Sequence, residues 1–292
     1  MKYMKTIIAA ILSLLLCGCA SPAEPAQIAA TTLPVWEFSS RLCAGTPITV
    51  TRLVTEQVSC LHDYSLNVRQ VKAAESAETI VISGAGLEDF LDDLLANASV
   101  IDASGGIPLL CGEEHEDEHP HEEGHHHEED PHIWLAPENA KVMARNICAG
   151  LSGRYPRYAQ TFEGNLQMLL KDLDVLEQYG EDKLSNLKCR ELITFHDGFS
   201  YFADAFDLTI VKAVEEESGS EASARDLIEL ITLVEEKALP AVFTETSGST
   251  SAAGIISRET GCGVFRLDMA MSGSSYFDAM YHNIDTIKEA LG

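Results

Sequence analysis

Residues 68–102 read VRQVKAAESAETIVISGAGLEDFLDDLLANASVID, and this stretch contains the unit from which the fold is predicted. Val68–Glu78 has the apolar spacing of an amphipathic helix, and Thr79–Ile82 is a short apolar run that is typical of a buried strand. Leu87–Leu95 again favours a helix, and Val100–Asp102 a further strand. Strands that alternate with helices of about ten residues indicate βα units and a parallel sheet.

The same alternation extends in both directions along the chain. Towards the N-terminus we expect strands at Gln27–Leu33, broken by Pro34, and at Ile48–Val54, with a helix at Val35–Ala44 between them. Towards the C-terminus the pattern predicts helices at Glu138–Leu151, Phe199–Phe206 and Ser223–Glu236, and strands at Glu191–Phe195, Leu208–Ala213, Pro240–Thr244 and Val264–Leu267.

One long helix is predicted between the two sets of βα units. Apolar side chains recur at helical spacing from Phe162 to Leu176, within a segment that runs from Arg157 to about Glu181. At 1.5 Å per residue, this segment would form a rod of roughly 37 Å, which is longer than an ordinary crossover helix. The sequence therefore predicts two α/β lobes joined by one long helix.

A segment rich in histidine and carboxylate interrupts the first set of units. Glu113–Asp130 contains six histidines and ten carboxylates, and it has neither lysine nor arginine. Because it has no apolar side chains to bury, we expect a mobile loop. Carboxylates alone would suffice for solubility, whereas imidazole mixed with carboxylate suits zinc, nickel or copper. The expected auxiliary metal ligands are His115, His119, His121, His125, His126 and His127.

The net charge of −26 bears on the class of partner. Nucleic-acid binding depends on lysine and arginine at the phosphates, so this charge argues against a nucleic-acid partner. A chain of 292 residues has room for one large domain or two medium ones.

The N-terminus has the pattern of an export signal. Met1–Lys5 carries two lysines, and the apolar run Thr6–Leu16 is too short to span a bilayer. The LCGC sequence that closes the run resembles a bacterial lipobox, in which Cys19 would be lipidated, and Ala20–Gln27 would be a tether. An ordinary cleaved signal without an anchor is the alternative. Either reading predicts a protein outside the cytoplasm, with lipidation placing it at the membrane surface.

Six cysteines would remain after processing: Cys43, Cys60, Cys111, Cys148, Cys189 and Cys262. An exported compartment permits disulfides, and six cysteines allow 15 full pairings, among which the sequence does not choose. An anaerobic source would leave all six reduced. No C-x-x-C pair of a structural zinc module is present.

Four histidines lie outside the acidic segment: His62, His132, His196 and His282. His62 and His196 follow predicted strands, and ligands of open α/β sheets gather at the carboxyl ends of strands. His132 lies between the acidic segment and a helix, which places it nearby. His282 falls within the expected final helix and is assigned to the surface or the core.

Asp268 ends the last predicted strand and completes a possible set of three histidines and one aspartate. Three imidazoles with a carboxylate or water satisfy the tetrahedral preference of zinc. Asp63 and Asp197, adjacent in sequence to two of these histidines, could orient the rings. Cys60 could serve as a thiolate ligand, although a disulfide or a buried thiol is favoured for an exported protein.

Four stretches identify a known family. They are LHDYSL at Leu61–Leu66, IVISGAGLEDFLDDLL at Ile80–Leu95, DPHIWLAP at Asp130–Pro137 and TFHDGFSYFADAFDL at Thr194–Leu208; Phe243–Glu245 and Leu267-Asp268 also fit. On these motifs the chain resembles the substrate-binding lipoproteins of bacterial zinc and manganese ABC importers, specifically the zinc-uptake branch. The resemblance implies two Rossmann-like lobes with parallel sheets, a long rigid linker helix, and metal in the cleft between the lobes.

The resemblance also implies a ligand set. His62, His132 and His196 match the three histidine ligands, and Asp268 matches the aspartate of the C-terminal lobe. A glutamate commonly stands at the position of His196 in the manganese branch, so this histidine favours zinc. Leu61 replaces a glutamate of some zinc members, and Met269–Met271 replaces the usual Pro-Leu-Gly. The fourth ligand is therefore open between Asp268, a nearby glutamate and water.

The resulting organisation is a signal peptide (1–19), a tether (20–27), an N-terminal lobe (28–153) that includes the loop 113–130, a linker helix (154–183) and a C-terminal lobe (184–292). We expect a monomer that carries Zn²⁺ as cargo to a membrane permease. Manganese or iron as cargo, a zinc store or adhesin, and a zinc hydrolase are the alternatives. No H-E-x-x-H pair supports the hydrolase.

Overall fold

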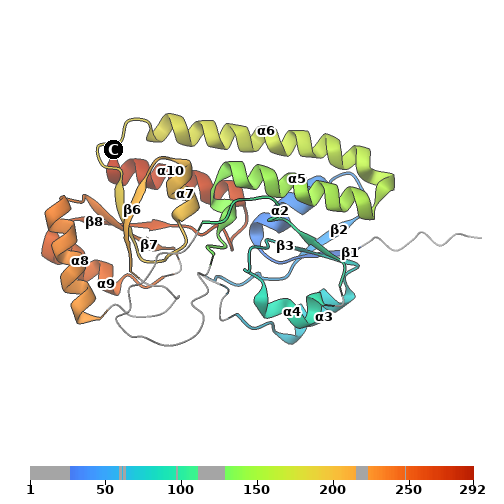
Figure 1. The fold of residues 1–292 in the computed structure, drawn as a ribbon, viewed down its shortest axis with the longest axis horizontal. Helices are drawn as coiled ribbons and strands as arrows, with labels where there is room; N and C mark the ends of the chain where they lie inside the picture. The colour runs from blue at the N-terminus through green and yellow to red at the C-terminus, as the bar shows by residue number, and fades with distance from the viewer. Residues whose placement is uncertain are drawn as a thin grey trace, which may run out of the picture.

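The computed structural model describes residues 27–58, 61, 64–96, 98–110, 129–214, 223–246 and 248–292. Within them, two α/β lobes lie side by side beneath one long helix, α6 (Figure 1). Each lobe has one sheet of four parallel strands. The prediction of two α/β lobes with parallel sheets is confirmed.

The N-terminal sheet has the strand order β2-β1-β3-β4. Its strands are β1 (Gln27–Ala30), β2 (Thr49–Arg52), β3 (Thr79–Ile82) and β4 (Val100–Asp102). The helices of this lobe are α2 (Leu33–Leu42), α3 (Val68–Ser76), α4 (Asp92–Leu95) and α5 (Pro137–Arg154), with 3-10 turns at Asp89–Leu91, Ile133–Leu135 and Pro156–Tyr158. Helices cover both faces of the sheet, with α3 and α4 on the side away from α6 (Figure 1).

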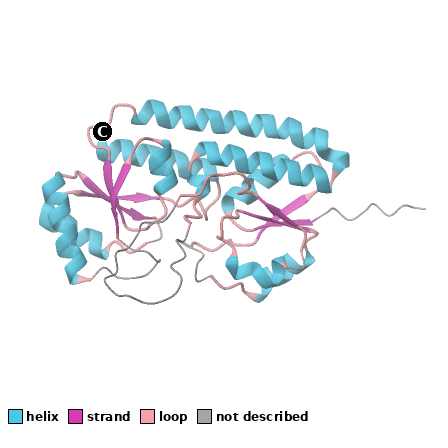
Figure 2. Ribbon diagram, viewed as in Figure 1, coloured by secondary structure: helices cyan, strands magenta, loops and turns pink. Residues whose placement is uncertain are grey.

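The C-terminal sheet has the corresponding order β6-β5-β7-β8. Its strands are β5 (Glu191–Thr194), β6 (Thr209–Ala213), β7 (Ala241–Glu245) and β8 (Gly263–Leu267). Its helices are α7 (Ser200–Ala205), α8 (Ala224–Lys237), α9 (Ser251–Thr260) and α10 (Tyr276–Leu291). Figure 2 shows the two sheets as separate fans of strands enclosed by helices.

The predicted long helix is α6 (Ala159–Leu184), which has 26 residues and runs along both lobes (Figure 1). Its buried stripe includes Phe162, Leu169 and Leu176, and it packs against α5, α10 and α2. Apolar residues of both lobes and of α6 belong to one continuous core. Because this largest cluster spans both lobes, burial of its apolar surface opposes their separation.

An ion cluster fixes α6 to α5. Lys141 Nζ lies 2.8 Å from Glu138 Oε2, 2.9 Å from Asp174 Oδ1 and 2.7 Å from Glu177 Oε2. Burial lowers the pKa of Lys141, but the three carboxylates raise it more, so the net pKa lies above that of an ordinary lysine. The ammonium group therefore stays charged and cross-links the two helices.

Some elements differ from the sequence predictions. Pro34 lies in the first turn of α2 instead of preceding a helix, because a residue without an N–H fits where no intrahelical bond is made. The predicted helix Leu87–Leu95 is a 3-10 turn followed by the short α4. The helix α9 was not predicted, since Ser251–Thr260 carries little apolar periodicity.

Two further expectations concern the membrane and the cysteines. None of the described helices combines the length and apolarity that a membrane crossing requires. Residues 1–26, with the expected lipidation site Cys19, lie outside the described part of the chain. The described cysteines Cys43, Cys148, Cys189 and Cys262 are free thiols. Cys60 and Cys111 lie outside that part.

Candidate metal centre

His132 lies at the entrance to the 3-10 turn Ile133–Leu135, in a tightly held segment. Asp130 Oδ1 accepts a hydrogen bond from the backbone N–H of His132 at 2.9 Å and also lies 2.8 Å from its Nδ1. The exposed fractions are 1% for His132 and 8% for Asp130. One carboxylate oxygen therefore fixes both the backbone and the ring of this histidine.

His196 reaches the same place from the other lobe. It follows β5, and its Nδ1 lies 3.2 Å from Glu245 Oε1 at the end of the neighbouring strand β7. Both side chains are buried, with 2% of His196 and 5% of Glu245 exposed. Parallel strands place their carboxyl ends at one edge of a sheet, which is why residues 49 positions apart meet here.

The two imidazole rings face one another across the lobes. Their centroids are 5.2 Å apart, and their planes are inclined by 85°. Each Nδ1 lies beside a carboxylate, which is the arrangement found where Nε2 of a histidine coordinates a metal. Such a carboxylate holds the ring in the correct tautomer and makes Nε2 a stronger donor.

Gly198 borders the Nε2 edge of His196. A Cβ atom at this glycine would lie 2.7 Å from Cδ2 and 2.8 Å from Nε2 of His196, and 2.8 Å from Cε of Met269. Any other residue would therefore fill the space beside Nε2. The absence of a side chain at Gly198 keeps that space open, with Met269 as its opposite wall.

Asp268 follows β8 and precedes Met269. Its backbone N–H donates to Asn283 Oδ1 at 2.7 Å, and its carbonyl accepts from Asn283 Nδ2 at 2.7 Å. Its Oδ1 accepts from the N–H of Ala270 at 2.8 Å, and Ala270 takes the left-handed conformation with φ of 54°. Asp268 is thus fixed one residue from the wall of the site, and one of its carboxylate oxygens already has a partner.

The structure brings together His132 and His196, two of the four expected ligands. Among the described residues, no group of three or more His, Cys, Asp or Glu side chains is arranged to hold a metal. His62 and Asp63 lie outside those residues, as do the six loop histidines, His115, His119, His121, His125, His126 and His127. His282 is exposed on α10, in agreement with its assignment away from the site.

Sequence reasoning missed both carboxylates at the Nδ1 atoms. It chose Asp197 because that residue is adjacent to His196, whereas the acid that contacts His196 Nδ1 is Glu245. The signal was available, since Glu245 directly follows the predicted strand Pro240–Thr244, as His196 directly follows Glu191–Phe195. Asp130, two residues before His132, was assigned to the acidic segment and to the DPHIWLAP motif, but not as a partner of the His132 ring.

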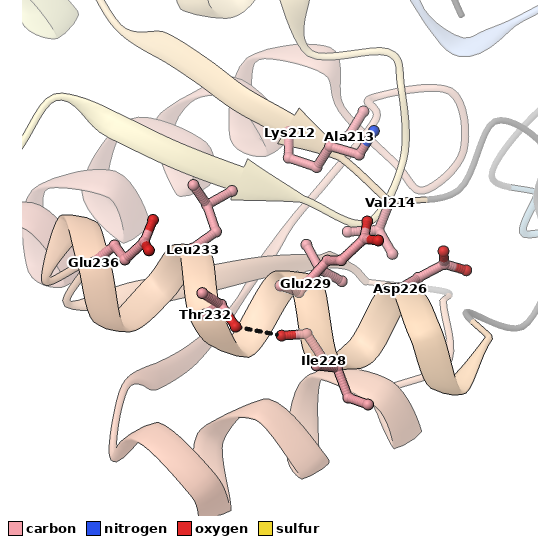
Figure 3. A pocket seen from close by; sticks show the side chains of 10 residues that line it. Lys212, Ala213, Val214, Asp226, Ile228, Glu229, Thr232, Leu233 and Glu236 are labelled. Atoms are coloured by element: carbon pink, nitrogen blue, oxygen red, sulfur yellow. Dashed lines mark hydrogen bonds between the residues drawn. The ribbon is translucent and has the colours of Figure 1, made fainter. Parts of the chain in front are cut away.

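A separate pocket lies in the C-terminal lobe, between the end of β6 and α8 (Figure 3). Its volume is about 650 Å³. Its lining residues are Lys212, Ala213, Val214, Asp226, Ile228, Glu229, Leu230, Thr232, Leu233 and Glu236. None of them is a histidine or cysteine, and we assign no metal to this pocket.

Known proteins resemble this chain in sequence and in fold. The family model described as zinc-uptake complex component A, periplasmic, matches residues 28–290. The zinc-binding lipoprotein AdcA of Streptococcus pneumoniae is 30% identical over 307 residues, which cover 99% of this chain and 61% of AdcA. This chain thus spans about three fifths of the length of that relative.

A further relative is named for manganese, and a solved structure shares the fold. The manganese-binding lipoprotein MntA of Halalkalibacterium halodurans is 28% identical over 242 residues, covering 79% of this chain and 77% of MntA. Among solved structures, a crystal structure of ZnuA superimposes with a TM-score of 0.79 at 30% identity, covering 92% of this chain and all of the other.

Proposed function

Because the chain belongs to the family of periplasmic zinc-uptake complex component A, we propose that it captures Zn²⁺ outside the cytoplasm and delivers it to an ABC-type membrane permease. The family is that of a transport component and not of an enzyme. The observation that carries the proposal is the buried pair His132 and His196, each with a carboxylate beside Nδ1. Imidazole nitrogens oriented in this way are preferred zinc ligands.

The proposed ligands are His62, His132, His196 and a fourth donor. Asp268 is the first candidate for the fourth position, because it follows β8 at the sheet edge that also carries His196. A nearby glutamate or a water molecule is the alternative. Zinc is the cargo of this site, so binding must be reversible enough for the permease to remove the ion.

The loop histidines, His115, His119, His121, His125, His126 and His127, are proposed as auxiliary sites. Several imidazoles among carboxylates would bind zinc weakly and exchange it quickly, and so raise the zinc concentration near the buried pair. The loop would thereby increase the rate of capture, while the buried site sets the affinity.

The proposed location is the outer face of the plasma membrane or the periplasm, with a lipid anchor at Cys19. Relatives are named lipoproteins, which supports the anchor. The proposed boundaries are a signal peptide at 1–19, a tether at 20–27, the N-terminal lobe at 28–153, the linker helix at 154–183 and the C-terminal lobe at 184–292. A monomer would present both lobes to the permease.

Manganese or iron is the second candidate for the cargo. The relative MntA is named for manganese, so membership of the wider group does not by itself select zinc. His196 supports zinc, because manganese prefers oxygen ligands and this position supplies a nitrogen. A zinc store or adhesin would use the same site without a permease.

Titration calorimetry with Zn²⁺ and with Mn²⁺ tests the proposal, on protein from which Glu113–Glu129 is deleted. We expect one tight zinc-binding event and negligible binding of manganese. His196→Ala should remove the tight event, whereas His282→Ala, on the exposed side of α10, should not. Tight manganese binding would assign the cargo to the other branch, and loss of all zinc binding with the loop would mean that the buried pair is not the site.

A further inference from the structure

His132 belongs to the N-terminal lobe by sequence, yet side chains of the C-terminal lobe hold the segment around it. On the N-terminal side, Tyr201 of α7 donates a hydrogen bond from Oη to the carbonyl of Asp130 at 3.0 Å. The same Oη accepts from the N–H of Leu110 at 2.9 Å, and the N–H of Asp130 donates to the carbonyl of Leu110 at 2.9 Å. The backbone of Asp130 is thus fixed on both sides, and its carboxylate in turn holds His132.

On the C-terminal side, Trp134 makes two further bonds to the same lobe. Its indole N–H donates to the carbonyl of Met269 at 2.8 Å, and its carbonyl accepts from Tyr276 Oη at 2.8 Å. Its ring meets the ring of His132 edge to face, with centroids 5.4 Å apart. Trp134 and Tyr276 are completely buried.

Three hydrogen bonds between this segment and the C-terminal lobe therefore bracket His132, at the residues two before it and two after it. Their acceptors are backbone carbonyls and their donors are rigid aromatic side chains. These bonds therefore fix the position of the backbone around His132 and add no charge to the site. All the side chains concerned are buried, where water does not replace a lost bond. The partner histidine, His196, lies in that same lobe.

We propose that Tyr201, Trp134 and Tyr276 are positioning residues that fix His132 to the C-terminal lobe, so that His132 and His196 form a preassembled pair before the metal arrives. This inference rests on the proposed function, because it concerns the same metal site. The ion would first meet two imidazoles already at their final separation, and the other ligands would bind afterwards. The conformational entropy that is lost when His132 is held beside His196 is therefore lost on folding and not on zinc binding.

The test removes one hydrogen-bonding group at a time and leaves an aromatic side chain in its place. Tyr201→Phe and Trp134→Phe should each raise the dissociation constant for Zn²⁺ about tenfold, as expected when an outer partner of a metal ligand is lost. Matched controls exist for both. Trp36→Phe removes an indole bond to Val50 within the N-terminal lobe, and Tyr155→Phe removes an exposed bond to Glu78. The controls should stay within twofold of the unmodified protein.

A double-mutant cycle separates positioning from general stability. In a His132→Ala background, Tyr201→Phe and Trp134→Phe should cause no further loss of zinc affinity, because the ligand that they position is absent. With Co²⁺ as probe, the visible spectrum of each single variant should shift, while the controls keep the original spectrum. Measurements are made below the melting temperature of each metal-free variant.

Two results would overturn the inference. Zinc affinity unchanged in both single variants, or an equal loss with and without His132, would show that these bonds serve only the fold. The proposed function fails differently, namely if His132→Ala and His196→Ala themselves bind zinc as tightly as the unmodified protein. The two failures are therefore distinguishable in one set of titrations.

Discussion

Replacement of Gly198 by alanine is the sharpest steric test of where the metal lies. The new Cβ would lie 2.8 Å from Nε2 of His196, and an ordinary contact begins at 3.4 Å, so one side must retreat by the difference, about 0.6 Å. The backbone itself accepts alanine, since Gly198 is not among the glycines with positive φ. The methyl group of Met269 can rotate away, but the His196 ring is buried and lies against Glu245, so part of the shift falls on the ring.

A zinc–nitrogen bond is about 2.0–2.1 Å long, so a displacement of this size removes Nε2 from its bonding position. We expect the zinc dissociation constant of Gly198→Ala to rise roughly 10- to 100-fold, the range for disturbed metal ligands. Overpacking should also cost roughly 1–3 kcal/mol of unfolding free energy.

Competition with a chromophoric chelator measures the affinity, and thermal unfolding of the metal-free protein confirms the fold. Gly164→Ala on α6 is the matched control, because outside its own stretch of helix backbone no atom lies within 4 Å of the added Cβ. If Gly198→Ala folds and binds zinc as tightly as this control, the space beside His196 Nε2 is not where the ion binds.

Four further predictions concern the pH dependence of zinc binding, two buried charged groups and the movement of the lobes. Zinc affinity should decrease when the pH is lowered below about 6, because only neutral imidazole coordinates the metal. Zinc titrations between pH 5 and 8 measure this, and a constant affinity would contradict it. Burial raises the pKa of Glu88 to about 7, although hydrogen bonds from Thr31, Ser83 and Gly84 oppose the shift. The folded state therefore binds this proton more tightly than the unfolded state. The unfolding free energy should decrease by up to roughly 3 kcal/mol as pH rises from about 4.5 to 7. In urea unfolding, the free energy of Glu88→Gln should not show this decrease with pH. If it depends on pH as that of the unmodified protein does, the prediction is wrong. Lys141→Met should lower the unfolding free energy by roughly 1–3 kcal/mol, because three carboxylates lose their common cation, whereas Lys183→Met at the exposed pair with Asp285 should leave it nearly unchanged. Metal-free and zinc-bound crystal structures should differ by only a small lobe rotation, since α6 and the shared core span both lobes, and a wide hinge opening would contradict this.

The parts of the fold that were predictable are those with a local signal. β3 and β7 are marked by short continuous apolar runs, and α6 by an apolar stripe that repeats with the helical period. The structure places all three within a few residues of the predicted ranges. The helix α9 lacks such a stripe, because only Ala253 and Ile256 of its side chains are buried, and it was missed.

The candidate site also has a part that the sequence predicts and a part that it does not. His196 was predicted as a ligand because a strand leads directly to it. The structure places it at the expected sheet edge, while its role as a ligand stays a prediction. The bond from Trp134 to Met269 joins residues 135 positions apart, and no local pattern in the sequence announces such a contact. Long-range bonds of this kind depend on how the lobes pack, which is decided by the whole core.

The placement of α10 bears on the order in which the molecule can mature. This helix contains the last apolar residues of the chain, yet its first residue, Tyr276, packs on Phe38 of α2, and Leu291 at its other end accepts bonds from Lys188 and Cys189 ahead of β5. Neither half of the molecule thus has its complete interior until the final helix has emerged. In a chain that emerges from its N-terminus, neither lobe can therefore complete its interior before α10 is available.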